Sequence, residues 1–454
     1  MAGKGTERVA ERQAARLDYG SIALASLPFM GMISFWQVYD GIVPKILVNT
    51  FGLDNSLAGA IMAIDNVFGL FLLPLFGILS DRCRSRLGRR TPFILLGSAI
   101  ATVSVPLLAL ADDAENLAML IGMILLTLFA ICMYRTMTVA VVADITPRPL
   151  RTKSDSIEKL VGYAGTGVML VAIAVMVPKT GRPDYLPLFL LQAAFIAVAA
   201  IVYAWRVREP ELVRRMHEQS LAMGIKEDEI DLDDSPEAGG KRKIQDPSVL
   251  FSIAMILAAT FFYYMSYNAM TTNISRYADG FFGLAGGSYA VINIVTIVGA
   301  LASYVPVANL SLKVGRKRVG VAMGVLMVAC PAVIWAFPGF SPVLYLVFLV
   351  QGVALGGFDL CVYPMLLENC DANSVGRYSG YYYTVSMAAQ VVTPILSGVV
   401  MDVAPRMLFG YITVMGVLML AAITLTRHGD TLLIDEVARR EEAYAEEGSE
   451  RLAG

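Results

Sequence analysis

Twelve apolar runs, each about 20 residues or longer, recur along the 454-residue chain and constrain its fold more than any other feature. A helix rises about 1.5 Å per residue, so a run of this length crosses a hydrocarbon core of about 30 Å. The composition agrees, because 56% of the residues are hydrophobic and only 16% are charged, against about 25% charged in a soluble domain. Twelve such runs cannot all be core helices of a soluble protein. The sequence therefore predicts an all-α integral membrane protein with twelve transmembrane helices.

The predicted helices fall into two sets of six. The first set covers residues 20–47, 56–79, 92–111, 117–143, 156–178 and 185–205, and the second covers 249–273, 285–310, 317–337, 342–367, 377–401 and 405–427. Residues 226–243, between the two sets, are too charged to lie in lipid or to form a core. We therefore expect an N-terminal tail at 1–19, a six-helix bundle at 20–205, a linker at 206–247, a second six-helix bundle at 248–427 and a C-terminal tail at 428–454.

The positions of Lys and Arg predict the orientation, because these residues gather on the cytoplasmic side of membrane proteins. With both termini inside, 30 of the 36 Lys and Arg residues fall in cytoplasmic segments, five fall outside and Arg135 lies within a helix. The five outside are Lys45, Lys179, Arg182, Arg276 and Arg406. We expect a protein of the plasma (inner) membrane with a cytoplasmic linker and cytoplasmic tails. Residues 432–447 carry mixed charges at helical spacing and predict a surface helix.

The two sets of helices look like a duplicated unit. The matches are Gly88-Arg89-Arg90 with Gly315-Arg316-Lys317 at an offset of 227, Arg135 and Asp144 with Asp359 and Glu368 at 224, and Arg151 with Arg377 at 226. Each match lies in the same relative helix of its half. Three matches at nearly one offset predict two pseudo-symmetric six-helix bundles, with substrate bound at their interface near the membrane midplane.

A loop signature adds a family resemblance. The segment GILSDRCRSRLGRRTPF, from Gly77 to Phe93, resembles the loop after helix 2 in major facilitator superfamily transporters. The usual pattern has one residue between Asp-Arg and Gly-Arg-Arg, whereas five residues separate Arg82 from Gly88 here. This longer form is similar to the plant sucrose-proton symporters, their animal relatives and bacterial glycoside transporters. Residues 134–157 and 376–383 are also similar to bacterial members of that group.

The resemblance covers residues 20–427 and implies the major facilitator fold and cation-coupled import of a glycoside. Two positions depart from the pattern of the relatives. Gly69 and Leu73 stand where the melibiose branch carries the acidic pair that binds sodium, which speaks against sodium coupling. Leu128 stands where the plant sucrose carriers have a membrane aspartate, so their proton site cannot be transferred to this chain.

Four ionisable residues within the predicted helices are candidates for proton coupling or for a central charge. Such groups are costly inside a bilayer and are normally paired and functional. Arg135 lies about 13 Å along its helix from Asp144, and its repeat counterpart is Asp359. We expect these two to face one cavity, where Arg135 binds sugar hydroxyls or keeps Asp359 ionised; a purely structural ion pair is the alternative. Asp65 is expected in coupling or gating and Asp40 at a wetted helix end. The alternative for Asp65 is a solvated or helix-packing role.

Sugar recognition needs aromatic faces for the pyranose ring and polar groups for its hydroxyls. Two helices offer both kinds of side chain. The substrate-binding candidates are Trp36, Gln37, Tyr39, Tyr264, Tyr267 and Asn268. The alternative is that these aromatic residues belong to the interfacial belts of Trp and Tyr found in most membrane proteins.

A cytoplasmic gate is expected in the loop after helix 2, where charges exchange partners as the two halves rock. Its candidates in that loop are Asp81, Arg82, Gly88, Arg89 and Arg90. By family resemblance, Asp144 and Glu368 would join them. The alternative is that the arginines only satisfy the positive-inside distribution.

These features predict a secondary active transporter that carries a disaccharide or related glycoside inward with protons by alternating access. The alternatives are an exporter of hydrophobic or drug-like compounds on the same fold and a non-transporting membrane sensor. The chain shows no nucleophile triad, metal cluster or phosphate loop, so we expect no enzyme activity, cofactor or metal. The expected partners are a glycoside, protons and the lipid bilayer, with no nucleic acid and a monomeric state.

Overall fold

The computed structural model describes residues 17–147, 150–178, 183–222, 247–369 and 375–428. Eleven helices in these ranges are long and apolar enough to span a membrane, and a bent pair of helices, Tyr19–Ala25 and Leu27–Thr50, supplies a twelfth span. Every named element in the described ranges is helical. The predicted all-α integral membrane fold is confirmed.

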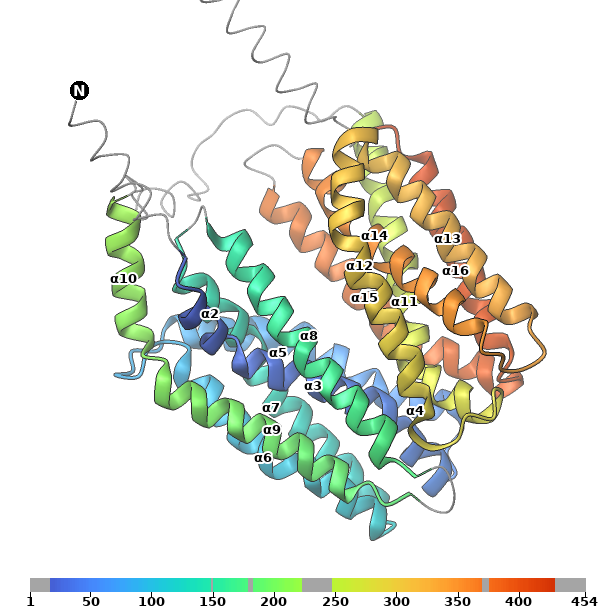
Figure 1. Cartoon of the computed structure of the whole chain (residues 1–454), viewed down its shortest axis with the longest axis horizontal. Helices are drawn as coiled ribbons and strands as arrows, with labels where there is room; N and C mark the ends of the chain where they lie inside the picture. The colour runs from blue at the N-terminus through green and yellow to red at the C-terminus, as the bar shows by residue number, and fades with distance from the viewer. Residues whose placement is uncertain (1–16, 148–149, 179–182, 223–246, 370–374, 429–454) are drawn as a thin grey trace, which may run out of the picture. The chain divides into compact units, whose positions relative to one another are not determined.

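The chain divides into two compact units, each shown in Figure 1. Unit 1 comprises residues 1–52 and 67–242, and unit 2 comprises residues 53–66 and 243–454. Unit 1 contains α2 (Tyr19–Ala25), α3 (Leu27–Lys45), most of α5 (Ile64–Asp81), α6 (Thr91–Asp113), α7 (Leu117–Asp144), α8 (Arg151–Met176), α9 (Leu186–Arg206) and α10 (Glu209–Ala222). Unit 2 contains α4 (Asn55–Met62), α11 (Pro247–Gly280), α12 (Tyr289–Val314), α13 (Arg316–Ala336), α14 (Leu344–Glu368), α15 (Val375–Val403) and α16 (Met407–Leu425).

The first predicted helix, 20–47, is wrong in one respect because it is broken rather than continuous. The helices α2 and α3 meet at Ser26 with a bend of 44°. Pro28 lies in the first turn of α3, where its missing N–H removes no bond that a helix start would make. The Ser26 hydroxyl and the Ser26 backbone N–H both donate to the Ile22 carbonyl, at 2.8 and 2.9 Å.

The second predicted helix, 56–79, is also interrupted. It consists of α4 and α5, which are separated at Ala63. The sequence assigned residues 53–66 to the N-terminal bundle, whereas their contacts belong to unit 2, in which α4 packs against α15. The boundary between the units therefore passes through this span.

The predicted linker contains regular structure at its start. Residues 209–222 form α10, which leaves the end of α9 at an angle in Figure 1. Glu209 and Glu211 lie in the first turn of α10, where negative charge favours a helix start. The remaining linker residues, 223–246, and the predicted surface helix at 432–447 lie outside the described residues.

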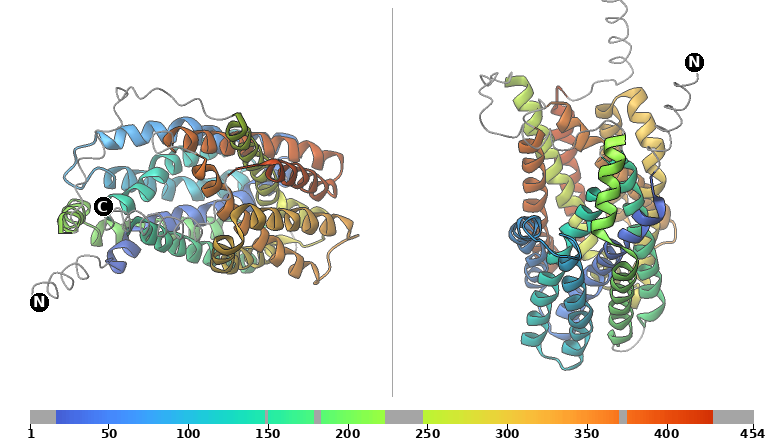
Figure 2. Two further views of the ribbon diagram at one scale, coloured as in Figure 1. Left: turned by 90° about the horizontal axis from the view of Figure 1, so that it is seen from above. Right: turned by 90° about the vertical axis from the view of Figure 1, so that its left-hand side faces the viewer.

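Within each unit the long helices pack side by side, as the further views in Figure 2 show. In unit 1, α6 packs on α7 and α9, and α3 packs on α8 and α9. In unit 2, α12 packs on α14, and α11 packs on α15 and α16.

Glycines set the closest of these helix crossings. A Cβ atom at Gly352 of α14 would lie 1.9 Å from the Thr296 carbonyl oxygen of α12, and one at Gly299 of α12 would lie 2.1 Å from the Leu349 carbonyl oxygen. Small residues allow two backbones to approach where lipid gives no hydrophobic drive for association. The contact between α12 and α14 therefore depends on glycine from both sides.

Replacing Gly352 by Ala is expected to force these two helices apart. We expect a loss of about 1–3 kcal/mol, the usual range for overpacking, and a lower melting temperature of the protein in detergent. Gly122→Ala in α7 is the control, because nothing lies within 4 Å of its Cβ position. Equal melting temperatures for both variants would contradict this account of the crossing.

Candidate functional site

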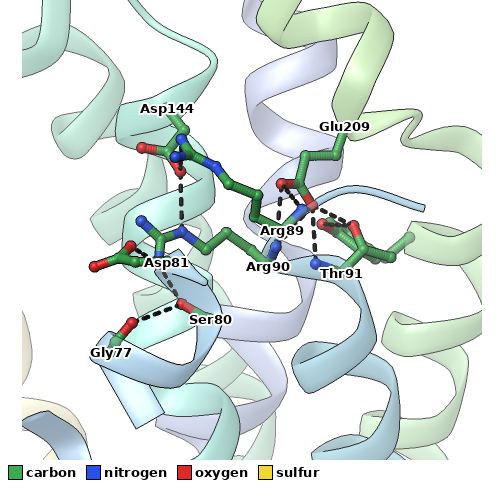
Figure 3. Close-up of polar contacts among 9 residues, drawn as sticks. Gly77, Ser80, Asp81, Arg89, Arg90, Thr91, Asp144 and Glu209 are labelled. Carbon is green, nitrogen blue, oxygen red and sulfur yellow. Dashed lines mark hydrogen bonds and ion pairs between the residues drawn. The ribbon is translucent and has the colours of Figure 1, made fainter. Parts of the chain in front are cut away.

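Arg90 is the centre of a charged cluster at one end of unit 1, shown in Figure 3. Its guanidinium lies 2.7 Å from the Asp81 carboxylate and 3.0 Å from the Asp144 carboxylate, and it also donates to the Ser80 hydroxyl. Arg89 reaches the same Asp144 oxygen at 3.7 Å. Burial opposes the charge of Arg90, but the hydrogen bond and charge of Asp144, with the charge of Asp81, outweigh burial and raise its pKa. Arg90 therefore fastens the end of α5 to the end of α7.

Glu209 closes the same cluster from the start of α10, and only 2% of its surface is exposed. Its carboxylate accepts the backbone N–H groups of Arg89 at 2.7 Å, Arg90 at 3.1 Å and Thr91 at 2.8 Å, and the Thr91 hydroxyl at 2.7 Å. The first N–H groups of a helix have no partner within the helix and carry partial positive charge. Glu209 therefore caps α6 and joins the start of α10 to the start of α6 (Figure 3).

Gly88 is required at the turn that leads into this cap. Its φ is +117°, a conformation that residues with a Cβ rarely adopt. A Cβ there would also lie 2.2 Å from a Glu209 carboxylate oxygen. Both backbone conformation and space therefore exclude other residues at this position.

Unit 2 repeats part of this arrangement. Gly315 has a φ of +101°, and Arg316, which follows it, forms an ion pair with Glu368 at the end of α14. Gly315 is the repeat counterpart of Gly88, and Glu368 is that of Asp144. The same geometry thus joins a glycine turn to a terminal carboxylate in each unit.

The gate candidates do not all enter these clusters. The structure brings together Asp81, Gly88, Arg89, Arg90 and Asp144 in unit 1, and it pairs Glu368 with Arg316 in unit 2. Arg82 is exposed.

Arg135 and Trp36 form a second candidate site, inside unit 1. The Arg135 guanidinium carbon lies 5.6 Å from the centre of the Trp36 ring, within the range of a cation–π interaction. Trp36 also meets the buried Tyr39 edge to face at 5.7 Å. Gln37 and Asp40, on the same helix, are partly buried. The predicted pairing of Arg135 with Asp359 joins different units and stays a prediction.

Tyrosines surround Asp359 in unit 2. The charge of Asp359 acts on the hydroxyl groups of Tyr263, Tyr264 and Tyr382. Tyr264 and Tyr382 are joined by a side-chain hydrogen bond, and their ring centres lie 6.5 Å apart. The ring of Tyr263 stacks on Phe358 at 5.3 Å. Three helices, α11, α14 and α15, therefore supply aromatic faces and hydroxyl groups around one carboxylate.

The remaining candidates of unit 2 lie near this aromatic group or at the break in the second span. Tyr267 stacks on Tyr263 with ring centres 6.2 Å apart and is 37% exposed. The Asn268 side-chain oxygen is buried and has no hydrogen-bond partner in the described part of the chain. Asp65 accepts the backbone and side-chain N–H groups of Asn66 at 2.6 and 2.5 Å.

A further polar cluster, absent from the sequence predictions, fixes α4 in unit 2. The Asp402 carboxylate of α15 accepts the backbone N–H groups of Asn55 at 2.7 Å and Ser56 at 2.9 Å. Arg276 of α11 is 7% exposed and donates to the Asn55 side chain at 2.9 Å and to the Asn273 side chain. These residues cap α4 with a carboxylate and hold it to α11 and α15.

Sequence reasoning missed Glu209 and Asp402 for different reasons, and it placed Tyr382 among weaker candidates for sugar contact. Glu209 precedes Pro210, and an acidic residue followed by proline is a helix-start signal that the charge of the linker obscured. Asp402 is 347 positions from the backbone it caps, a separation that no local pattern reveals. Tyr382 belongs to a run of three tyrosines, from 381 to 383, and only its burial at 5% distinguishes it from exposed Tyr381 and Tyr383.

The chain matches the sequence profile of the Major Facilitator Superfamily over residues 22–305 and 256–447. It is 26% identical to the alpha-ketoglutarate permease of Escherichia coli over 170 residues, 37% of each protein. It is 36% identical to a sucrose transport protein of Oryza sativa subsp. indica over 92 residues, 20% of this chain and 15% of that one. It is 38% identical to the proton-associated sugar transporter A of Mus musculus over 117 residues, 22% and 15% of the two chains. These matches span 37% or less of each relative.

Solved structures share the fold along most of the chain. The inward open structure of the xylose transporter XylE from E. coli matches with a TM-score of 0.67 and 13% identity, covering 91% of this chain and 97% of that one. The POT family transporter PepTSo matches with a TM-score of 0.62 and 10% identity, covering 91% and 100%.

Replacing Glu209 by Gln is expected to weaken the cap of α6. Gln retains one acceptor oxygen but loses the charge, so we expect a loss of about 1–3 kcal/mol in stability, seen as a lower melting temperature. Glu211→Gln is the control, because Glu211 lies on the same helix and pairs with Arg215 on the surface. A loss of equal size in the control would refute the capping role.

Replacing Asp402 by Ala is expected to release α4, since loss of a capping side chain costs about 1 kcal/mol. The reporter is the substitution Ala58→Cys, at a position of α4 that is fully buried. We expect its thiol labelling to be faster in the Asp402→Ala background, measured by peptide mass. Asp113→Ala, at an exposed helix end, should leave the labelling rate unchanged.

Proposed function

The chain belongs to the Major Facilitator Superfamily and is a membrane transporter rather than an enzyme, and from that premise we propose that it imports a disaccharide or related glycoside together with protons. The observation that carries the proposal is the group of tyrosines around Asp359 in unit 2. Pyranose rings present C–H faces that pack on aromatic rings, and their hydroxyls bind hydroxyl and carboxylate groups. Tyr263, Tyr264 and Tyr382 offer both kinds of contact.

The second contribution to sugar binding comes from unit 1. The Arg135 guanidinium of α7 lies over the Trp36 ring of α3. An aromatic face and several N–H donors therefore lie close together on two helices of unit 1. In the proposed mechanism, substrate contacts Trp36, Gln37 and Arg135 from one half and the Asp359 group from the other. Alternating access then exposes this site to each side of the membrane in turn.

Proton coupling is assigned to carboxylates within the spans. A carboxylate in a dry site favours its protonated form and releases the proton once water reaches it. Asp359 suits this role, because it lies on α14 within a membrane span and its charge acts on the neighbouring tyrosines. Partial similarity to a sucrose transport protein and to a proton-associated sugar transporter supports the choice of sugar and proton.

The charged clusters are proposed as the cytoplasmic gate. Arg90 with Asp81 and Asp144, and Arg316 with Glu368, would exchange partners as the two halves rock. In this proposal Glu209 keeps the backbone of the loop after α5 in place while the side-chain pairs change.

Uptake of radiolabelled sucrose, maltose and hexoses into proteoliposomes, with an inward proton gradient imposed or collapsed, tests this function. We expect accumulation of one sugar only with the gradient, and loss of accumulation in Asp359→Asn. Tyr264→Phe should weaken sugar binding about tenfold, because one hydrogen bond to substrate is worth about 1.4 kcal/mol. Tyr383→Phe, at an exposed tyrosine of the same aromatic group, is the control. If no sugar accumulates under any gradient, the sugar assignment fails and the transporter fold remains.

A further inference from the structure

Glu158 is a buried carboxyl group that the proposed mechanism does not use. It lies two turns into α8, within a predicted membrane span, and only 2% of its surface is exposed. Its Oε1 atom is buried and accepts no hydrogen bond from the described residues. An ionised carboxylate in such a place is costly unless donors or a cation compensate it.

The nearest charges on α8 do not compensate Glu158. Lys159 binds Asp155 at 2.8 Å, and both of these side chains are about half exposed, at 58% and 49%. Among the described residues, the charges that act on Glu158 are those of Asp155 and Lys159, and they are opposite in sign. The surface pair thus leaves the buried carboxyl group without net counter-charge.

The helices packed on α8 carry other charged groups, but these are engaged elsewhere or do not act on Glu158. Helices α2, α3, α7 and α9 pack on α8. Their described charged residues are Asp18 at the start of α2, Asp40 and Lys45 on α3, Arg135 and Asp144 on α7, and Arg206 on α9. Asp18 binds Ser21, Arg135 lies over Trp36, Asp144 binds Arg90, and Arg206 lies over Trp205.

The buried side of α8 faces the start of α3, next to the bend at Ser26. Gly162, one turn after Glu158 and on the same face, would place a Cβ 2.7 Å from the Phe29 ring. Thr166, one turn further, is also buried, and its hydroxyl has no hydrogen-bond partner among the described residues. Two buried polar side chains, Glu158 and Thr166, therefore lie on the face of α8 that packs against the broken helix.

We propose that Glu158 is a proton-binding site of unit 1 that holds a proton in this conformation and releases it when the α2–α3 bend moves and water reaches the carboxylate. The protonated acid is neutral, so it can lie among apolar neighbours without a cation. This assignment rests on the proposed proton coupling and adds a carboxyl group from the other half of the molecule.

Chemical labelling of the full-length protein tests the proton itself, independently of substrate. The O–H group of a protonated carboxyl adds across one C=N bond of dicyclohexylcarbodiimide, so that the oxygen bonds to the central carbon and the hydrogen moves to a nitrogen. The acyl group of this O-acylisourea then shifts from oxygen to nitrogen and gives a stable N-acylurea with no leaving group. We expect peptide mass spectrometry to find Glu158 labelled at neutral pH and Asp155, which forms an ion pair with Lys159, unlabelled. Absence of label on Glu158, or equal label on Asp155, would overturn the proposal.

Transport assays test the coupling role. We expect Glu158→Gln, which mimics the protonated acid, to lose gradient-driven accumulation while retaining sugar exchange without a gradient. Glu158→Asp should restore part of the accumulation, and Asp155→Asn should behave as wild type. Gradient-driven accumulation in Glu158→Gln equal to wild type would overturn the coupling role.

The two assays separate this proposal from the proposed function. If wild type moves no sugar, the sugar assignment fails, yet the labelling result still decides whether Glu158 binds a proton. If Glu158→Gln does not fold, labelling of wild type over a range of pH decides the same question.

Discussion

The hydrocarbon core of the membrane allows no unpaired backbone groups, and the rest of this structure depends on that constraint. A helix satisfies its own N–H and C=O groups except at its ends, so each end or break needs a partner. At two helix starts in the described part of the chain, these partners are side chains that are distant in sequence. Glu209 supplies them for α6 and Asp402 for α4, whereas Asp18 and Asn116 cap α2 and α7 locally.

Carboxylates therefore have two distinct tasks in this protein. At helix starts they accept backbone N–H groups, and the result is a fixed connection between segments distant in sequence. Asp144 and Glu368, at helix ends, pair instead with arginine side chains, which can turn away without breaking a helix. The first arrangement suits a permanent joint, and the second suits a contact that forms and breaks.

The sequence predicted the number of spans and the internal repeat well because both follow from hydropathy and spacing. The glycines at 88 and 315, which occupy matched positions in the repeat, share a positive φ. Hydropathy could not reveal the breaks at Ser26 and Ala63, since a broken span is as apolar as a straight one. Opposite charge made Asp81 and Asp144 foreseeable as partners of Arg90. Glu209 was not foreseeable, because it accepts a backbone N–H group 119 positions away. The group around Asp359 depends on which faces of three helices are buried, which spacing alone did not resolve.

The assignment of residues 53–66 to unit 2 has a consequence for the independence of the two halves. The chain passes between the units three times, after residues 52, 66 and 242, rather than once through the linker. A fragment ending in the linker would carry α4 without α15, leaving Gly59 and its neighbours facing lipid or solvent. The complementary fragment would keep Asp402 without the N–H groups it caps. Unit 2 is thus completed by a segment from the N-terminal part of the chain, and a cut in the linker would separate that segment from the helices it packs on.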